Sequence, residues 1–198
     1  MARNKYSDPR YFLQAHDRGH NPLHTNVLRA NTQKKVTEDE VKVVADLLYS
    51  ITHTTHAFAI AANQRGWNSP IFVSRWDLEQ LRGLPMSDQL SIIHQSELKD
   101  RRNITLYRNP HYVPLSDEVY VSESCLSYEG EQCLVKRHMH IEATVEVLDM
   151  VARRGNRSRN HWTKKTFILE GLAAQIFQHE YDHLIGEGIW LWRFRNNV

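Results

Sequence analysis

The sequence has few cysteines, no strong excess of either charge and no long apolar run. Its two cysteines, Cys125 and Cys133, are too few for a disulfide framework, so a thiol here is better explained as a ligand or a nucleophile. The formal net charge of +2 gives no general attraction to nucleic acid or membranes. No apolar segment is long enough to cross a bilayer, and the first residues lack the apolar core of a signal peptide. We therefore expect a cytoplasmic protein with no membrane contact.

Length and composition are those of one ordinary globular domain. Of the 198 residues, 41% are hydrophobic and 24% are charged, which is enough for a sizeable core. We expect residues 1–198 to form a single domain and a monomer. Two polar stretches are predicted to be a surface insertion (74–102) and a solvated basic loop (151–165). The basic charge of 151–165 leaves open a contact with phosphates of ribosomal RNA.

Apolar periodicity predicts one helix early in the chain, one late, and strands between them. Thr37 and Glu40 have the spacing of a capping box, and apolar residues recur at helical spacing up to about Thr52. Residues 141–148 alternate as a half-buried antiparallel strand does. Residues 57–64 are predicted to be a core-facing turn or the tail of the first helix. Shorter strands are predicted at 71–73, at 104–107 with an end at Asn109-Pro110, and at 119–121, 134–135 and 166–169.

The late helix, residues 170–186, contains the motif His179-Glu180-x-x-His183. Positions i and i+4 lie on one helix face, so the two imidazoles can reach one divalent metal, with Glu180 beside them. Glu170 is expected to cap the helix and Gly186 to end it. In a chain with 12 histidines the motif can arise by chance, so alone it favours a metal site no more than an ordinary helix.

Two further stretches favour the metal site. The sequence AFAIAANQ occupies 57–64, ESCLS occupies 123–127 and HEYDHL occupies 179–184. In this order they resemble the three motifs of the peptide deformylase family, G-x-G-x-A-A-x-Q, E-G-C-L-S and H-E-x-D-H-L. The resemblance extends over roughly residues 25–192 and departs from the family at three glycines, which are replaced here by Ala57, Ala59 and Ser124.

The resemblance implies a fold and a reaction. The fold would be α+β, with antiparallel β-strands packed around a central HExxH helix. The reaction would be metal-dependent removal of the formyl group from N-formylmethionine at the start of new polypeptides. Cys125, His179 and His183 would hold the metal, which leaves a fourth position open for water. Glu180 would accept a proton from that water and pass it to the leaving amine.

The resemblance also implies how the substrate and the metal are held. The Gln64 side chain and the Leu126 backbone N–H would stabilise the oxyanion. The metal would be Fe(II), with Zn, Ni or Co as other occupants. Asp182 is expected to orient a ligand imidazole. Substrate-binding residues would be Phe58, Ala59, Glu123, Leu172 and Gln175.

Two other functions remain open on the sequence. An HExxH metallopeptidase normally finds a third ligand downstream, where only Glu187 is available here. The second alternative is a metal-binding protein of deformylase fold with lost or altered activity. Ala57 and Ala59 favour it, because a glycine at either position could allow a positive φ or a close approach of the substrate. The intact Gln64 and HExxH motif favour the enzyme over this second alternative.

Overall fold

The computed structural model describes residues 8, 12–14, 23, 28, 37–54, 56–82, 87–88, 103–151 and 159–191, with the backbone alone at 149–151 and 159–160. Residues 83–86 and 89–102 of the predicted surface insertion, and 152–158 of the predicted basic loop, lie outside this description.

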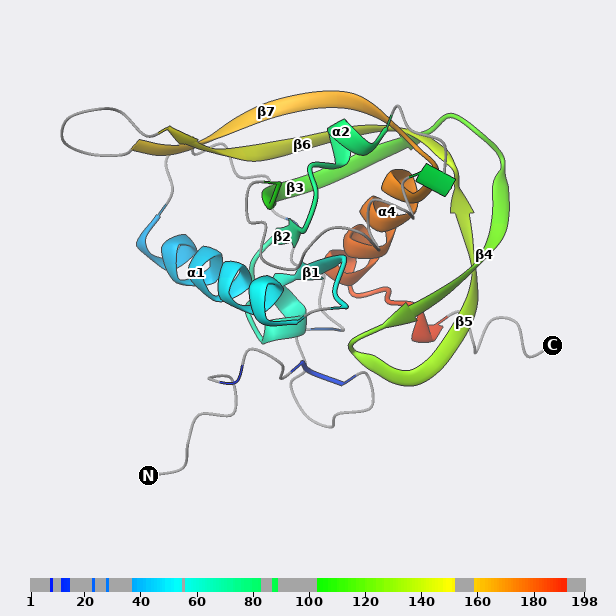
Figure 1. Ribbon diagram of the computed structural model, residues 1–198, viewed down its shortest axis with the longest axis horizontal. Helices are drawn as coiled ribbons and strands as arrows, with labels where there is room; N and C mark the ends of the chain where they lie inside the picture. The colour runs from blue at the N-terminus through cyan, green and yellow to red at the C-terminus, as the bar shows by residue number, and fades with distance from the viewer. Residues whose placement is uncertain are drawn as a thin grey trace.

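Five antiparallel strands form the central sheet, in the order β1-β2-β3-β6-β7 (Figure 1). Two more strands pair with each other as a separate hairpin, and the helix α4 contacts both sheets. This arrangement confirms the predicted α+β architecture. The strands are β1 (Ala59–Ala61), β2 (Ile71–Ser74), β3 (Thr105–Pro114), β4 (Glu118–Cys125), β5 (Tyr128–His138), β6 (His140–Val151) and β7 (Arg159–Glu170). The helices are α1 (Glu38–His53), α2 (Leu78–Leu81) and α4 (Gly171–Ile185), with a 3-10 turn η3 (Ala62–Arg65).

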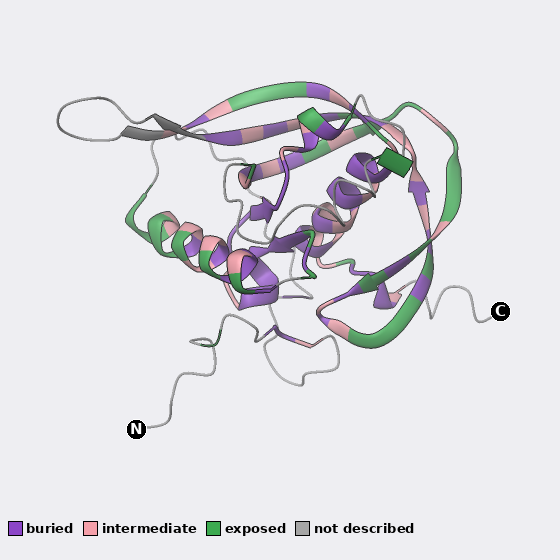
Figure 2. Ribbon diagram, viewed as in Figure 1, coloured by how far each residue is buried: buried purple, intermediate pink, exposed green. Residues whose placement is uncertain are grey.

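The two long helices pack on opposite faces of the sheet. In β2, Phe72 belongs to the core cluster that contains α4 and lies 5.9 Å from Phe177, between ring centroids. Its neighbours Ile71 and Val73 belong to the cluster that contains Leu47 of α1. Successive strand residues point to opposite faces, so one short apolar strand serves both cores. Figure 2 shows these inner surfaces buried, while the outer side of α1 and much of the β4–β5 hairpin are exposed.

The start of α1 follows the predicted capping box. The Thr37 hydroxyl accepts the Glu40 N–H at 3.2 Å, and the Glu40 carboxylate accepts the Thr37 N–H at 2.8 Å. Each bond satisfies a backbone donor that a helix start leaves open. The helix ends at His53, one residue beyond the predicted end.

The predicted half-buried strand is confirmed in β6, but β3 runs further than expected. Ile141 and Ala143 are fully buried in β6 while Glu142 between them is exposed. β3 does not stop at Asn109-Pro110, as predicted. It passes this point through a bulge at which Asn109 has a φ of 50°. The Asn109 N–H donates to the carbonyl of Pro70, so tertiary contacts support a conformation that asparagine tolerates.

Three further expectations need correction. Residues 57–64 are neither a turn nor a helix tail, because 59–61 form β1 and 62–64 form most of η3, with 57–58 leading into the strand. The predicted surface insertion begins inside the core, since Trp76, Leu78 and Leu81 are buried. The basic stretch is strand β7 from Arg159 onward, with Trp162 only 3% exposed, and not a solvated loop.

Helix α4 follows β7 directly and ends where the sequence predicts. Gly186 closes it in the left-handed conformation with a φ of 79°, which glycine adopts without strain. Glu170 makes no capping bond with its side chain, so that prediction is wrong. The Gly171 N–H instead donates to the Met139 carbonyl at 2.9 Å. No helix in the described ranges combines the length and apolar character that a membrane crossing requires.

Two valines of α1 provide a test of this packing. Val43 is 4% exposed and belongs to the core, whereas Val41 is 54% exposed. Val43→Ala is expected to lower the free energy of unfolding by about 2 kcal/mol, because it removes buried methyl groups and leaves a cavity. Val41→Ala, the matched control, is expected to change it by less than about 0.5 kcal/mol. Urea denaturation measures both, and equal losses would contradict this placement of α1.

Candidate metal centre and its pocket

Three potential metal ligands meet where the end of β4 faces α4. Cys125 ends β4, and His179 and His183 lie one turn apart on α4. The Cys125 Sγ lies 3.2 Å from His183 Nε2, and the two histidine Nε2 atoms lie 3.2 Å apart. The three ligand atoms all lie within 4.8 Å of one another. The structure therefore brings together the three side chains that were predicted to hold a metal.

The chemistry of this donor set fits a divalent metal. Tetrahedral coordination at 2.0–2.3 Å places neighbouring donor atoms about 3.3–3.6 Å apart, close to the separations found here. One thiolate and two imidazoles suit Fe(II), Zn, Ni and Co, and disfavour Mg or Ca. Cys125 and His183 are buried, so a bound ion would be largely removed from water. Three protein ligands leave one position for a small molecule.

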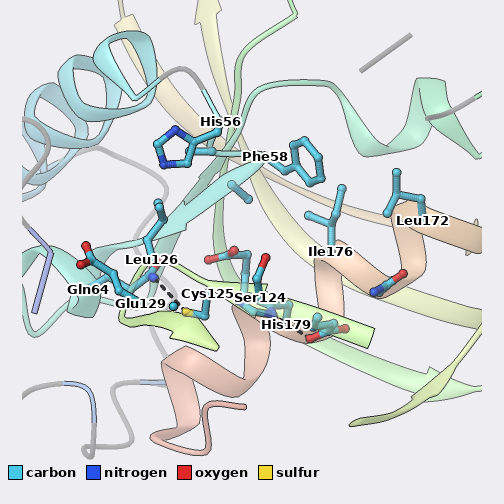
Figure 3. A pocket seen from close by; sticks show the side chains of 16 residues that line it. His56, Phe58, Gln64, Ser124, Cys125, Leu126, Glu129, Leu172, Ile176 and His179 are labelled. Atoms are coloured by element: carbon cyan, nitrogen blue, oxygen red, sulfur yellow. Dashed lines mark hydrogen bonds and ion pairs between the residues drawn. The ribbon is translucent and has the colours of Figure 1, made fainter. Parts of the chain in front are cut away.

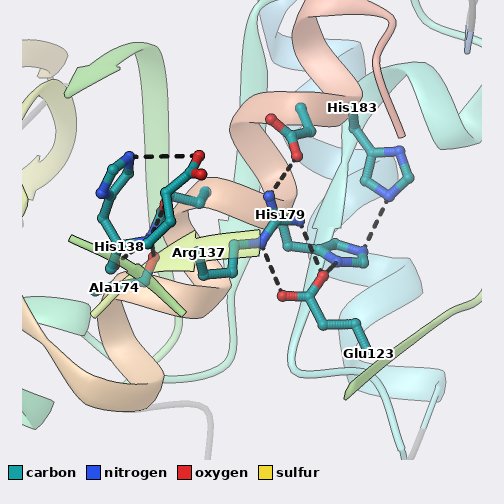
Figure 4. A network of polar contacts seen from close by, with 9 residues as sticks. Glu123, Arg137, His138, Ala174, His179 and His183 are labelled. Carbon is teal, nitrogen blue, oxygen red and sulfur yellow. Dashed lines mark hydrogen bonds and ion pairs between the residues drawn. The ribbon is translucent and has the colours of Figure 1, made fainter. Parts of the chain in front are cut away.

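A buried carboxylate fixes the orientation of one ligand. Glu123 Oε2 accepts from His179 Nδ1 at 2.8 Å, which leaves His179 Nε2 free to coordinate (Figure 4). Arg137 donates to both oxygens of Glu123, each at 2.9 Å. Burial favours the neutral acid, but His179 and Arg137 outweigh it and hold the pKa of Glu123 at about 2. Glu123 is therefore a permanent anion behind the ligand.

This contact overturns the expectation for Asp182 and adds a second role for Glu123, whose predicted role in substrate binding stays a prediction. Asp182 was expected to orient a ligand imidazole, but its carboxylate accepts from Arg137 at 2.6 Å. Glu123 makes the imidazole contact instead. Glu123 was also expected to bind substrate. It lines the pocket, but both of its oxygens are engaged by protein groups. The sequence analysis missed the pairing of Glu123 on β4 with Arg137 on β5, which lies fourteen positions later in the chain.

Glu180 lies beside the ligands, and its carboxylate forms no ion pair with any residue that the structure describes. It is 3% exposed, and its Oε2 atom has no hydrogen-bond partner among the described residues. Burial raises its pKa to about 7. A buried carboxyl group without a partner is costly to keep, which is typical of a functional group.

Gln64 and Leu126 lie next to Cys125, as predicted. The Gln64 Nε2 lies 3.6 Å from Cys125 Sγ and donates to Ser127 Oγ at 3.2 Å. Its Oε1 accepts the Ala61 N–H at 2.9 Å, which turns the amide nitrogen toward the thiol. Leu126 follows Cys125 directly, and its carbonyl accepts from Gln14. The Gln64 side-chain amide and the backbone N–H of Leu126 are thus two potential hydrogen-bond donors next to the thiol ligand.

A pocket of about 370 Å³ opens onto this cluster (Figure 3). Its walls come from residues 56–59, from the β4–β5 hairpin and from α4. Phe58, Ala59, Leu172 and Gln175 all line it, as the sequence predicted. The sequence analysis missed Ile176, which helical spacing from Leu172 could have found. It also missed His56, Glu129 and Gly130, for which no local pattern gave a signal, whereas Ser124 lies within the motif at 123–127.

The alanines that replace the two family glycines fit without backbone strain. Ala57 and Ala59 are buried, and Asn109 is the only non-glycine residue with positive φ in the described part of the chain. Arg75 supports this wall, because its guanidinium donates to the carbonyls of Ile51, Thr54 and Ala57. The methyl groups therefore change the pocket wall and leave the chain path undisturbed.

Comparison with known proteins gives relatives of one kind. The family model for polypeptide deformylase matches residues 20–190. A curated peptide deformylase of Bifidobacterium adolescentis is 40% identical over 80 residues, which cover 40% of this chain and 31% of that relative. A peptide deformylase of Hamiltonella defensa is 26% identical over 158 residues, which cover 80% of this chain and 72% of that relative.

A solved structure shows the same fold. A peptide deformylase from Legionella pneumophila superposes with a TM-score of 0.62 at 18% sequence identity. The superposition covers 91% of this chain and 83% of that one. The fold is therefore shared across most of both chains.

The Glu123 contact can be tested through metal affinity. Glu123→Gln is expected to weaken Zn(II) binding by about 10- to 100-fold, because an amide no longer stabilises the ligand ring as a carboxylate does. Asp182→Asn is the matched control. It also removes a carboxylate charge that pairs with Arg137, but it leaves the hydrogen bond between Glu123 and His179 unchanged. Competition with a chelating dye measures both affinities. Equal losses in the two variants would contradict a special role for Glu123.

Proposed function

Because this chain belongs to the polypeptide deformylase family, we propose that it removes the formyl group from the N-terminal formylmethionine of newly made polypeptides and releases formate. The observation that carries this proposal is the position of Glu180 and Gln64 beside the cluster of Cys125, His179 and His183, where all of these residues except His183 line one pocket. Such a site combines a metal, a proton carrier and a hydrogen-bond donor, which amide hydrolysis requires.

Cys125, His179 and His183 would hold the metal, and we propose Fe(II) as the native ion, with Zn, Ni or Co as substitutes. When bound, the ion supplies a Lewis acid that lowers the pKa of a water and polarises the formyl oxygen. Leu172, Ile176 and Ala59 form buried apolar parts of the pocket wall.

Glu180 moves the proton. Its unpaired Oε2 accepts a proton from the attacking water as the C–O bond forms. The same oxygen then gives the proton to the leaving nitrogen as the C–N bond breaks, so that formate and a free α-amino group result. General acid–base catalysis of this kind contributes about 10²- to 10⁴-fold to rate.

Gln64 and Leu126 would stabilise the negative charge that develops on the formyl oxygen. The Gln64 amide is fixed in advance by its bond from Ala61, so its N–H groups need no rearrangement during reaction. The Leu126 backbone N–H would be the second donor, which is supported by its position directly after the Cys125 ligand.

The substrate-binding proposal follows from the pocket wall. Phe58, Leu172 and Ile176 offer an apolar surface for the methionine side chain, and Ala59 and Gln175 border it. Formyl-peptide substrates would enter from the open side, where Phe58 is 37% exposed. Glu123, which also lines the pocket, would take part in substrate binding chiefly by holding His179 in place.

The described site favours this function over the two alternatives. A peptidase of the HExxH type would need Glu187 as its third ligand, but Glu187 is exposed and is not part of the ligand cluster. A binding protein with lost activity would not need to keep the unpaired, buried Glu180 beside the ligands.

We propose a cytoplasmic, monomeric, single-domain enzyme whose partners are N-formylmethionyl peptides. Contact with the ribosome through 151–165 stays a prediction. Within that stretch, Lys164 and Lys165 are exposed on β7, so their charges are open to a partner.

Formate release tests the proposed reaction. Protein loaded with Fe(II) under anaerobic conditions is expected to release formate from formyl-Met-Ala-Ser. Glu180→Ala is expected to lower kcat by about 10²- to 10⁴-fold with unchanged metal content, because Glu180 carries the proton and is not a ligand. Cleavage of an internal peptide bond would instead indicate the peptidase, and metal binding without formate release would indicate the binding protein.

Gln64 offers an independent test of charge stabilisation. Gln64→Leu is expected to lower kcat by about 10²- to 10³-fold, because the oxyanion loses a donor. Gln64→Glu keeps the side-chain shape and the acceptor for Ala61 but lacks the donor, so a similar loss is expected. Steady-state kinetics separate kcat from KM. A change confined to KM in both variants would contradict this role.

A further inference from the structure

The rim of the pocket carries one open negative charge. Glu129 lies near the start of β5, lines the pocket and is exposed. Its backbone N–H donates to Gln14 Oε1 at 3.5 Å, but no described residue pairs with its carboxylate. The carboxylate is therefore available to a ligand that enters the pocket.

Glu129 is also the only uncompensated acid at the pocket mouth among the described residues. Three carboxylates line the pocket, and no lysine or arginine does. Glu123 is neutralised by Arg137, and Glu180 is buried beside the metal ligands. Among the described residues, Glu129 is therefore the acid whose carboxylate is both unpaired and exposed at the pocket entrance.

Figure 3 places Glu129 with Gln64 and Leu126 on one side of Cys125. The apolar residues Phe58, Ile176 and Leu172 lie on the other side in this view. In an extended peptide, successive side chains point in opposite directions and advance about 3.3 Å per residue. If the first side chain points to the apolar wall, the second points toward the side that carries Glu129.

We propose that Glu129 makes this site prefer formylated peptides with lysine or arginine directly after the methionine. This inference rests on the proposed deformylase function. The formyl group removes the positive charge of the amino terminus, so a cation near the reacting bond can come only from a side chain. A basic second residue would pair with Glu129, whereas an acidic one would be repelled.

The test compares formyl-Met-Lys-Ala with formyl-Met-Glu-Ala. The kcat/KM ratio is expected to favour the lysine peptide by roughly threefold to tenfold at low ionic strength and to shrink as salt is added. Glu129→Gln is expected to bring the ratio close to one, and Glu129→Lys to invert it. Formyl-Met-Ala-Lys is expected to show a smaller advantage, because its charge lies one residue further on.

Glu131→Gln is the matched control. Glu131 lies two residues further along the same hairpin, has the same charge and does not line the pocket. This variant is expected to keep the preference of the unchanged protein. An equal effect of Glu129→Gln and Glu131→Gln, or no preference in the unchanged protein, would overturn the proposal.

A binding measurement separates this proposal from the proposed reaction. The dissociation constants of the two peptides can be compared by calorimetry on Glu180→Ala protein, in which turnover is suppressed. Tighter binding of the lysine peptide that is lost in Glu129→Gln/Glu180→Ala supports the inference even if no formate is released. Equal binding of the two peptides overturns the inference even if formate is released.

Discussion

The Glu123 carboxylate is buried between Arg137 and His179, and the site depends on this arrangement. A buried anion is tolerated only with close compensation, which the Arg137 guanidinium provides through two hydrogen bonds. The anion in turn favours the His179 tautomer that is protonated at Nδ1, and this tautomer leaves the Nε2 atom of His179 facing the ligand cluster. Glu123 and Cys125 are both buried, with exposed Ser124 between them, so the same stretch of β4 positions the carboxylate and the thiol.

Helix α4 serves the core and the site together. Leu172, Ile176, His179 and His183 follow one another at spacings of three or four residues, so the apolar pocket wall and the metal ligands form one stripe. Leu172 and Ile176 also belong, with Ala173 and Phe177, to the core cluster that joins the helix to the sheet. The rigidity of the packed face holds the ligands in place, which precise catalytic geometry requires.

Local signals were enough to predict several elements of the fold and two of the ligands, and the family resemblance supplied the fold class and Cys125 as the third ligand. The capping box fixed the start of α1, and residue spacing placed two imidazoles on one face of α4. The path of β3 through Asn109 could not be predicted, because the bulge depends on contacts with Pro70 and β6. The choice of Glu123 over Asp182 as the partner of His179 likewise depends on where the hairpin lies against the helix. The exposed Glu129 had no periodic pattern to mark it.

The thiol comes from a hairpin outside the central sheet, whereas the imidazoles come from a helix packed against that sheet. An ion bound by Cys125, His179 and His183 would join these parts, and because the three ligands are assembled only in the folded chain, its binding would stabilise the folded state. Removal of the ion would release the hairpin from one of its attachments. The lifetime of the folded chain in a cell would then follow the supply of the ion, so that metal starvation would deplete the protein itself as well as its activity.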